Sequence, residues 1–356
     1  MSIAIIINPI AGGARVEDAT ARGEVASRML ERHHLTGEVF VTERRGHARD
    51  LARIAIEHGA RRVLVWGGDG TVSEVASVLA STPVVLGIVP AGSGNGLARE
   101  LGLSANPRLA LTTAMQAEPQ AMDMGEIDGR LFVNTAGIGF DAHVAAAFDA
   151  PTNRRRGLVT YAAIAARALV SYRPDRYAIT TGQGRTNVRA VLVTIANSAQ
   201  FGNGARIAPG ARVDDGLLDL VVVEERARWR TVCQLPRLFT GTVHRMPEWS
   251  SERVTEATIE CDQPMLVHLD GEPVQAGCSL KVRVHPGVLL VAVGQRRLGP
   301  GPVRVESREG TVAVRPQVCH SVARTIPYRH HRPALADVRA AGAPNIARSI
   351  ASAMAL

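Results

Sequence analysis

RVLVWGGDGTVSEV, residues 62–75, joins an apolar run to a glycine-rich turn and then to a helical pattern. Arg62–Trp66 has the composition of a buried strand, and the turn Gly67–Thr71 follows it directly. Ser73–Ser81 has the spacing of a helix and precedes a second apolar strand, Val84–Val89. A strand, a helix and another strand at this spacing predict a βαβ unit with parallel strands.

The same alternation extends to both sides of this unit. Strand-like runs occur at Ile3–Ile7 and Glu38–Thr42, and helical patterns occur at Val16–His33, at His47–His58 and from Asn95 onward. Residues 1–121 are therefore predicted to form an α/β domain, in which a parallel sheet carries helices on both faces.

A different pattern begins near residue 122. Only Leu158–Tyr172 and Trp229–Phe239 have helical spacing, and the rest alternates strand-like runs with turn residues. The expected strands are Leu131–Thr135, Tyr177–Thr181, Val188–Ala196, Leu217–Val223, Val254–Cys261, Met265–Leu269, Leu280–Val284 and Val288–Val293. This pattern predicts a mostly antiparallel, β-rich domain over residues 122–298, with its end packing back on the first domain. Residues 299–356 form a basic tail punctuated by Gly and Pro.

Composition and charge exclude several classes of protein. The 356 residues are 46% hydrophobic and 21% charged, which excludes collagen-like and wholly disordered chains. No apolar run approaches the ~20 residues of a membrane span, and the N-terminus does not resemble a signal peptide. The four cysteines form no close pair, which favours a reducing cytoplasm.

The net charge of +8 is uneven, because residues 299–356 hold eight arginines against Glu306, Glu309 and Asp337. The body is thus near neutral, so we expect no nucleic-acid partner. The basic tail is suited to an anionic membrane surface, or it serves only to keep the chain soluble.

Three glycine-rich turns follow strands of the first domain: NPIAGG (8–13), GGDGT (67–71) and PAGSGN (90–95). Each of them also meets the steric needs of a tight connection between a strand and a helix. All three nevertheless lie at the carboxyl ends of parallel strands, where such sheets bind ligands, and their glycines expose backbone N–H groups to a phosphate. The chain has no P-loop lysine, because Lys281 is its only lysine, and no G-x-G-x-x-G follows Ile3–Ile7.

Carboxylates in or near turns allow two interpretations each. Asp69 either caps the next helix or organises Mg²⁺ beside phosphates. In the sequence LDGEP (269–273), Asp270 and Glu272 either belong to a hairpin turn or supply a general base and its electrostatic partner. The pair Asp214-Asp215 is either a turn or a metal site, and His47 is expected to begin a helix.

Together these motifs resemble the diacylglycerol kinase catalytic-domain family, which includes soluble bacterial lipid kinases and the sphingosine and ceramide kinases. The resemblance covers roughly residues 1–295 and rests on NPIAGG (8–13), GGDGTVSEV (67–75), PAGSGNGLAREL (90–101), NTAGIGFDAHV (134–144), APGARVDDGLLDL (208–220) and LDGEP (269–273). It implies a nucleotide-binding α/β domain, a β-rich domain and ATP between them.

The resemblance also implies roles for individual residues. The implied nucleotide contacts are Asn8, Thr42, Gly67, Gly68, Asp69, Gly70, Thr71, Val72, Ser73 and Ser93. A structural Mg²⁺ would be held by Asp215 and the main chain of Arg212 and Leu217. Asp270 would act as the catalytic base, with Glu272 linked through water to Mg²⁺ and Asp69. Glu272 as the base is the alternative.

The sequence thus predicts a cytoplasmic, Mg²⁺-dependent kinase that transfers the γ-phosphoryl group of ATP to a lipid hydroxyl at the bilayer surface, first of all to diacylglycerol. Ala11 departs from the Ser that is frequent in relatives, and Ser93 departs from the Thr of many bacterial members. Because the form Gly92-Ser93-Gly94-Asn95 is also common in the sphingoid-base kinases of the family, a sphingoid base or ceramide is the alternative acceptor. Leu158–Tyr172 is a candidate acyl-chain wall or plain core. NAD kinase chemistry and a catalytically silent ATP- or lipid-binding regulator are more distant alternatives, and a homodimer is compatible with the sequence.

Overall fold

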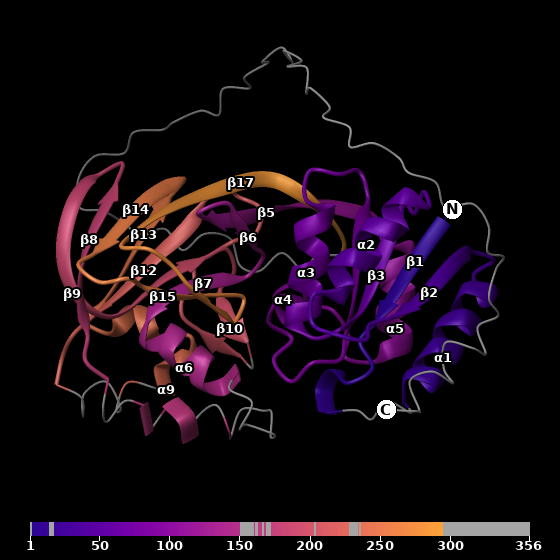
Figure 1. Ribbon diagram of the computed structural model, residues 1–356, viewed down its shortest axis with the longest axis horizontal. Helices are drawn as coiled ribbons and strands as arrows, with labels where there is room; N and C mark the ends of the chain where they lie inside the picture. Colours follow the sequence, from indigo (N-terminus) through magenta and orange to yellow (C-terminus); the bar gives the residue numbers. More distant parts are fainter. Residues whose placement is uncertain are drawn as a thin grey trace, which may run out of the picture. The chain divides into compact units, whose positions relative to one another are not determined.

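A computed structural model describes residues 2–13, 18–149, 160, 163–165, 167–168, 172–202, 204–227, 234 and 236–294 (Figure 1). In the predicted helices Leu158–Tyr172 and Trp229–Phe239, residues 160, 163–165, 167–168, 234 and 236–239 are described and are helical. Most of the other residues of these two helices, and the whole of the tail 299–356, lie outside the described residues. Among the described residues, no helix has the length and apolar character that crossing a bilayer requires.

The N-terminal part is an α/β domain built on four parallel strands. These are β1 (Ser2–Ile7), β2 (Thr36–Val41), β3 (Arg62–Gly67) and β4 (Val85–Pro90), in the spatial order β4-β3-β1-β2. Each neighbouring pair is parallel. Since parallel neighbours point the same way, the turns after β1, β3 and β4 all lie at one edge of the sheet.

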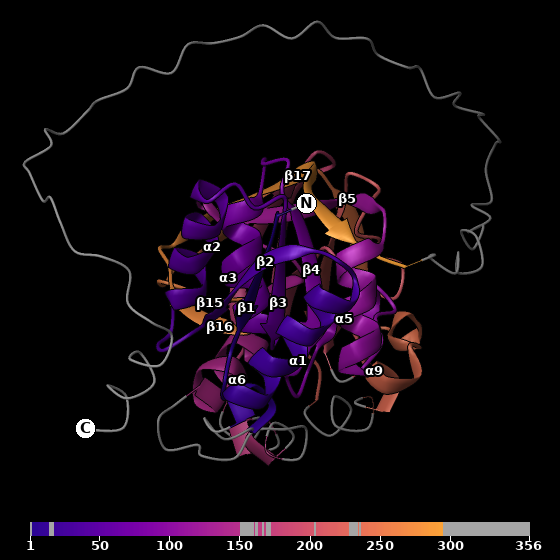
Figure 2. The same cartoon turned by 90° about the vertical axis from the view of Figure 1, so that its right-hand side faces the viewer.

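Helices cover both faces of this sheet, as predicted. α2 (His47–Glu57) and α3 (Asp69–Leu79) lie on one face, and α1 (Asp18–Arg32) and α5 (Pro107–Gln116) lie on the other (Figure 2). Strand β1 shows the cause, because Ile3, Ile5 and Ile7 pack in the cluster with α1 and α5, whereas Ala4 and Ile6 pack with α2 and α3. A strand covered on both faces is apolar at every position.

Two helix boundaries differ from the prediction. α3 begins at Asp69 rather than at Ser73, so the GGDGT turn supplies the first helical turn, with Gly68 at the N-cap. The helix expected from Asn95 is only α4 (Gly96–Glu100), and α5 is a separate helix. The side chain of Asn106 caps α5 by accepting bonds from the backbone N–H groups of Arg108 and Leu109.

The second part is β-rich and antiparallel, as predicted. After α6 (Phe140–Asp149), the described elements are mostly strands, and the helical residues are those at 160, 163–165, 167–168 and 234 and the short helices α9 (Pro236–Thr240) and η2 (Val243–Arg245). The strands are β5 (Pro119–Ile127), β6 (Arg130–Phe132), β7 (Thr135–Gly139), β8 (Asp175–Thr181), β9 (Gly184–Ala196), β10 (Gln200–Gly202), β11 (Ala205–Arg206), β12 (Leu218–Glu224), β13 (Trp249–Val254), β14 (Glu256–Cys261), β15 (Leu266–Leu269), β16 (Glu272–Gln275) and β17 (Ser279–Ala292).

One long strand joins the two parts. The predicted strands Leu280–Val284 and Val288–Val293 are a single element, β17, which runs along the upper side of Figure 1 from one part to the other. It pairs with β14, then with β5, and finally in parallel with β4 through Leu290 and Val291. Residues 1–299 consequently form one compact unit.

Candidate active site

The three glycine-rich turns meet at the carboxyl edge of the parallel strands. A Cβ atom added at Gly92 would lie 2.7 Å from Gly68 Cα, and one at Gly12 would lie 2.2 Å from the carbonyl oxygen of Ala91. Only glycine permits backbones to approach this closely. The turns at 8–13, 67–71 and 90–95 are therefore one continuous backbone surface of the kind that accommodates phosphate groups.

Polar side chains fix the first two turns to each other. Asn8 donates from Nδ2 to Thr71 Oγ1 at 2.9 Å, and its own Oδ1 accepts from the N–H of Ile10 at 3.2 Å. Thr42 is buried and donates its backbone N–H to the carbonyl of Ile7 at 2.9 Å. The expected nucleotide contacts Asn8 and Thr42 thus follow the adjacent strands β1 and β2, and Thr71 lies in the first turn of α3.

The remaining expected nucleotide contacts surround the beginning of α3. Gly67 and Gly68 precede the helix, Gly70, Val72 and Ser73 lie in its first turns, and Ser93 is exposed in the third turn. A helix of this length presents unpaired N–H groups and a positive dipole end to a ligand at its N-terminus. Val72 itself is buried in the core beneath the turn.

Asp69 bridges the second and third turns. Its Oδ1 accepts from the N–H of Gly96 at 2.7 Å, and a Cβ at Gly94 would lie 2.8 Å from its Oδ2. Burial raises the pKa of Asp69, the hydrogen bond from Gly96 opposes that shift, and the negative charge of Asp270 adds to it. The two carboxylates therefore lie close enough to interact, although 201 positions separate them in the numbering of the chain.

Asp270 is held by four hydrogen-bond donors. Oδ2 accepts from Ser73 Oγ at 2.7 Å and from the N–H of Val133 at 2.9 Å. Oδ1 accepts from the N–H groups of Asn134, at 2.8 Å, and Thr135, at 3.2 Å. Burial raises the pKa of Asp270 in spite of these bonds. The contact from Ser73 joins the GGDGTVS helix directly to the DGE turn of the β-rich part.

Glu272 occupies a different environment. Its carboxylate is exposed and pairs with Arg45 Nε at 3.4 Å, while Arg45 also contacts Asp149 at 2.8 Å. That pairing with Asp149 is the main cause of the raised pKa of Arg45. Asp270 is therefore the more enclosed of the two DGE carboxylates, and Glu272 lies beside a cation at the surface.

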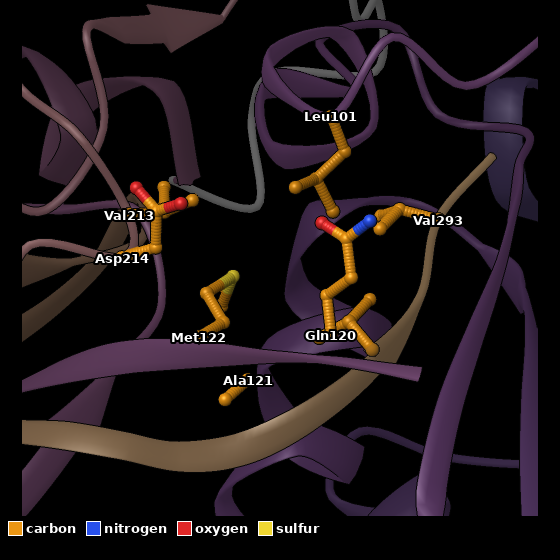
Figure 3. Close-up of a pocket in the computed structure, with 8 residues that line it drawn as sticks. Leu101, Gln120, Ala121, Met122, Val213, Asp214 and Val293 are labelled. Carbon is orange, nitrogen blue, oxygen red and sulfur yellow. The ribbon is translucent and has the colours of Figure 1, made fainter. Parts of the chain in front are cut away.

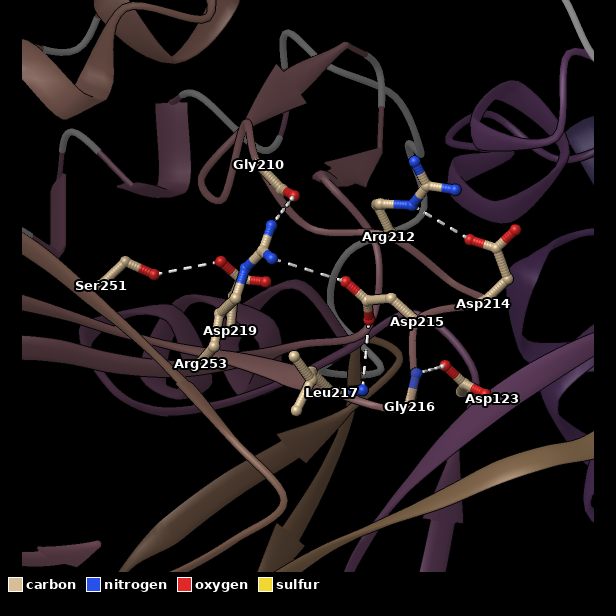
Figure 4. Close-up of polar contacts among 10 residues, drawn as sticks. All are labelled: Asp123, Gly210, Arg212, Asp214, Asp215, Gly216, Leu217, Asp219, Ser251 and Arg253. Atoms are coloured by element: carbon tan, nitrogen blue, oxygen red, sulfur yellow. Dashed lines mark hydrogen bonds and ion pairs between the residues drawn. The ribbon is translucent and has the colours of Figure 1, made fainter. Parts of the chain in front are cut away.

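The expected metal ligands lie in the loop before β12 (Figure 4). Asp215 Oδ1 accepts from the N–H of Leu217 at 3.2 Å, its Oδ2 lies 3.9 Å from Arg253 Nη1, and Arg212 pairs with Asp214 at 3.3 Å. Burial raises the pKa of Asp215.

These donors are oxygen atoms, which suit a hard cation, and a cation there would offset the burial of Asp215. In the described part of the chain, no three acidic, His or Cys side chains are grouped so that they could hold a metal ion. A Mg²⁺ ion held here would thus take one carboxylate, main-chain carbonyls and water, a donor set that Mg²⁺ accepts.

A small cavity lies apart from the glycine turns. It has a volume of about 10 Å³ and is lined by residues that include Leu101, Gln120, Met122 and Asp214 (Figure 3). This volume is near the minimum for one water molecule and cannot take a nucleotide. Its walls come from β5, β17 and the loop that carries Asp214, where the two parts of the chain join.

The sequence reasoning missed several polar residues of the site. Asp123 is buried in β5 and accepts from the N–H groups of Gly216 and Gly287, both at 2.7 Å. His268 and Asp141 form a buried pair beneath the DGE turn. The sequence marks Asp123 in one way only: it is an acidic residue between Met122 and Met124, in an apolar stretch and not in a turn. An acidic residue in such a stretch is unusual and points to a buried, hydrogen-bonded carboxylate.

Known proteins resemble both parts of the chain. The model of the diacylglycerol kinase catalytic domain matches residues 2–127, and the model of the YegS C-terminal NAD kinase beta sandwich-like domain matches residues 134–293. A protein of Chromohalobacter salexigens named "Probable lipid kinase YegS-like" is 33% identical over 268 residues, which cover 73% of this chain and 84% of the relative. A protein of Mycobacterium tuberculosis named "Diacylglycerol kinase" is 31% identical over 282 residues, which cover 76% of this chain and 88% of the relative.

A solved structure supports the same fold. The crystal structure of a diacylglycerol kinase from Bacillus anthracis aligns with a TM-score of 0.62 at 19% identity, covering 83% of this chain and 97% of that one. Two domain models match consecutive parts of the chain, and relatives above 30% identity match it over most of their length. The chain belongs to the lipid kinase family that combines a diacylglycerol kinase catalytic domain with a YegS-type C-terminal domain.

Proposed function

We propose that this chain transfers the γ-phosphoryl group of ATP to the hydroxyl group of a membrane lipid, and that diacylglycerol is the acceptor. One observation carries the proposal: the hydrogen bond from Ser73 to Asp270 brings the turn that is suited to phosphates against an enclosed carboxylate of the other domain. Phosphoryl transfer needs a positioned donor, neutralised charge and a base near the acceptor hydroxyl, and these groups supply the first and third requirements.

In this proposal the N-terminal domain binds the nucleotide. The backbone surface of the three glycine turns and the N-terminus of α3 receive the phosphates, and the polar contacts Asn8, Thr42, Thr71, Ser73 and Ser93 orient the nucleotide. Asp69 is the acidic group of this surface. Asp215, with the main chain of Arg212 and Leu217, would hold a structural divalent cation in the loop before β12.

Asp270 serves as the base, and its surroundings indicate how the lipid hydroxyl reaches it. An ionised carboxylate offers about four lone-pair positions, and four donors already occupy those of Asp270. Three of these donors are backbone N–H groups, whereas Ser73 contributes a hydroxyl that can rotate away. The acceptor hydroxyl therefore takes the position of Ser73 Oγ on Oδ2 before it gives up its proton.

A sphingoid base is the second candidate acceptor, because Gly92-Ser93-Gly94-Asn95 is a form common in sphingoid-base kinases. Either lipid would be met at a membrane surface. A lipid panel separates the two candidates, since diacylglycerol offers one primary hydroxyl on glycerol whereas sphingosine offers a hydroxyl beside an amine.

The test is Mg²⁺-dependent transfer of labelled γ-phosphate into mixed micelles of diacylglycerol, sphingosine, ceramide, monoacylglycerol or phosphatidylglycerol. We expect label in diacylglycerol and a loss of about 10²–10⁴-fold in kcat for Asp270→Ala, the range for a general base. The control is Glu256→Gln, which changes an exposed carboxylate on β14. Folded protein that binds ATP but labels none of these lipids would contradict the proposal.

A further inference from the structure

A buried histidine and a buried aspartate lie directly beneath the DGE turn. The side chains of His268, on β15, and Asp141, on α6, are 5% and 6% exposed, and His268 Nε2 lies 3.4 Å from Asp141 Oδ2. On the other side of the ring, Nδ1 accepts a hydrogen bond from the backbone N–H of Gly271 at 3.3 Å. The imidazole thus connects α6 to the residue between Asp270 and Glu272.

These contacts define which ring nitrogen carries the proton. Nδ1 faces an N–H donor, so it must present its lone pair, and the proton of the neutral ring lies on Nε2, facing the Asp141 carboxylate. Movement of the proton to Nδ1 would place it against the N–H of Gly271 and push the turn away. The carboxylate of Asp141 therefore selects the tautomer that the DGE turn requires.

The pair is itself fixed on its remaining sides. Asp141 Oδ2 accepts from Thr194 Oγ1 at 3.0 Å, and Oδ1 accepts from the N–H of Ala142 at 2.8 Å. A Cβ at Gly137 would lie 1.9 Å from Asp141 Oδ2 and 2.6 Å from His268 Nε2, so the absence of a side chain on β7 makes room for both groups. Backbone and side chains from α6, β7, β9 and β15 meet at this point.

We propose that Asp141 and His268 are positioning residues for phosphoryl transfer, which act by setting the DGE turn so that the Asp270 carboxylate faces the acceptor. The turn needs such support, because Asp270 has a φ of 50°, a left-handed conformation that is unfavourable for a residue with a side chain. This inference rests on the proposed role of Asp270. Neither Asp141 nor His268 touches the reacting atoms in this proposal.

Two substitutions at His268 distinguish the role of Nδ1 from that of Nε2. The amide of His268→Asn can place an oxygen where Nδ1 lies and so still accept from Gly271, whereas His268→Gln reaches the position of Nε2 and loses that acceptor. We expect kcat to fall about tenfold more in His268→Gln than in His268→Asn, the effect of about one hydrogen bond, with KM for ATP unchanged in both. Asp141→Asn would keep its acceptor for Ala142 and turn its NH₂ toward Nε2, which favours the wrong tautomer.

The matched control is His285→Gln, because His285 pairs with Glu126 at 2.7 Å in the same domain but has no described contact with the DGE turn. Its kcat should equal that of the wild type. Thermal melting curves of all variants identify any variant that does not fold, because such a variant shows no cooperative transition.

Long-range ¹H–¹⁵N correlation of the histidine side chains tests the inference without any kinase assay. We expect His268 to carry its proton on Nε2 in the wild type and on Nδ1 in Asp141→Asn, with a shifted Gly271 amide in the variant. A proton on Nδ1 in the wild type, or equal losses of kcat in His268→Asn and His268→Gln, would overturn the inference. If the wild type labelled no lipid, the proposed function would fail, and the tautomer measurement would still decide whether Asp141 and His268 set the turn.

Discussion

At the scale of single residues, Asp69 and Asp270 both have a pKa above the ordinary value for an aspartate. Burial raises the pKa of both Asp69 and Asp270, and the charge of Asp270 raises that of Asp69 further. A carboxyl group whose pKa is higher in the folded chain than the ordinary ~3.9 favours folding when protonated. Its contribution is complete below about pH 3.9 and is lost as the pH rises through the folded pKa.

Asp69→Asn should therefore change how stability depends on pH. The amide oxygen can still accept the bond from the N–H of Gly96 that Asp69 Oδ1 accepts at 2.7 Å, while the buried charge is removed. We compare the free energy of unfolding of Asp69→Asn with that of the wild type at each pH. The variant minus the wild type should be larger at pH 7.5 than at pH 4.5, because the wild type loses stability over that interval.

Urea unfolding at the two pH values measures this difference. Glu256→Gln, which removes one exposed carboxylate, is the control for the loss of a negative charge. A difference between Asp69→Asn and the wild type that stayed constant, or that reversed in sign, would show that Asp69 does not carry the raised pKa.

Gly92 lies where the third glycine-rich turn contacts the second. In Gly92→Ala the new methyl group would lie 2.7 Å from Gly68 Cα and 2.9 Å from Asn95 Oδ1, so the second and third turns must separate. Overpacking of this kind costs about 1–3 kcal/mol of stability, and we expect ATP binding to weaken with it. Gly23→Ala in α1 meets no atom within 4 Å and should stabilise the chain by about 0.5–1 kcal/mol. Urea unfolding and ATP titration of both variants check this, and equal ATP affinity would contradict it.

At the scale of elements, β5 and β17 are joined to the loop before β12 by one buried carboxylate. Asp123 on β5 accepts from the N–H of Gly287, at the irregular point of β17, and from the N–H of Gly216 in the loop beside Asp215. Figure 4 shows Asp123 next to Gly216 at the end of that loop. Its backbone N–H also donates to Val213 at 2.7 Å, so a single strand position fixes the loop at two points.

Asp123→Ala should leave two N–H groups without their acceptor. We expect a loss of about 1–3 kcal/mol for each donor that stays buried and unpaired, with the loop before β12 released from β5. Glu260→Ala on β14 removes one partner of an exposed ion pair with Arg185 of β9 and should cost less than about 1 kcal/mol. Chemical unfolding measures the stability of both variants. Comparable losses in Asp123→Ala and Glu260→Ala would show that Asp123 does not fix the loop before β12 to β5 and β17.

The elements that the sequence predicted best are those with a local cause. β1, β3 and β4 are apolar at nearly every position because helices cover both faces, and the glycine-rich turns mark where each strand ends. The fusion of two predicted strands into β17 was missed, because His285, Pro286 and Gly287 look like a turn in the sequence. Asp123 instead holds the N–H of Gly287 within one bent strand.

The candidate site was predictable only in its motifs. GGDGT and DGE each have a recognisable local pattern, which is why Asp69 and Asp270 could be singled out. The contact between Ser73 and Asp270 spans 197 positions and the pair Asp141–His268 spans 127, so no local spacing reports either of them. The pair Asp141–His268 follows from the antiparallel register of β7 with β15, which the alternation of apolar residues leaves open.

At the scale of the whole molecule, one strand contributes to the hydrophobic cores of both domains. Leu289 is fully buried on β17, pairs with Met122 of β5, and packs in the cluster that contains Leu79, Leu86 and Ile88 of the N-terminal domain. The same strand begins in the other cluster, where Leu280 packs with Leu218. A strand that belongs to both cores links their stabilities.

We therefore expect the two domains to unfold together. Trp66 lies on β3 and Trp249 on β13, so variants that retain one of these tryptophans report on one domain each, with Trp229 replaced by Phe in both. Within each of these variants, urea unfolding followed by tryptophan fluorescence and by far-ultraviolet circular dichroism should give the same midpoint, which is the test of a two-state transition.

Substitutions on either side of the shared strand extend this test. Leu289→Ala and Leu218→Ala each remove a fully buried side chain, one from each cluster, and each should cost about 2–5 kcal/mol. Because β17 couples the clusters, either substitution should lower the midpoint reported by both tryptophans equally. Domains that are merely tethered would respond separately, with Leu289→Ala moving only the transition of Trp66 and Leu218→Ala only that of Trp249. Coupled unfolding would mean that the Ser73–Asp270 contact is made between bodies that β17 already holds in register, so the site needs no separate closing step to bring its two motifs together.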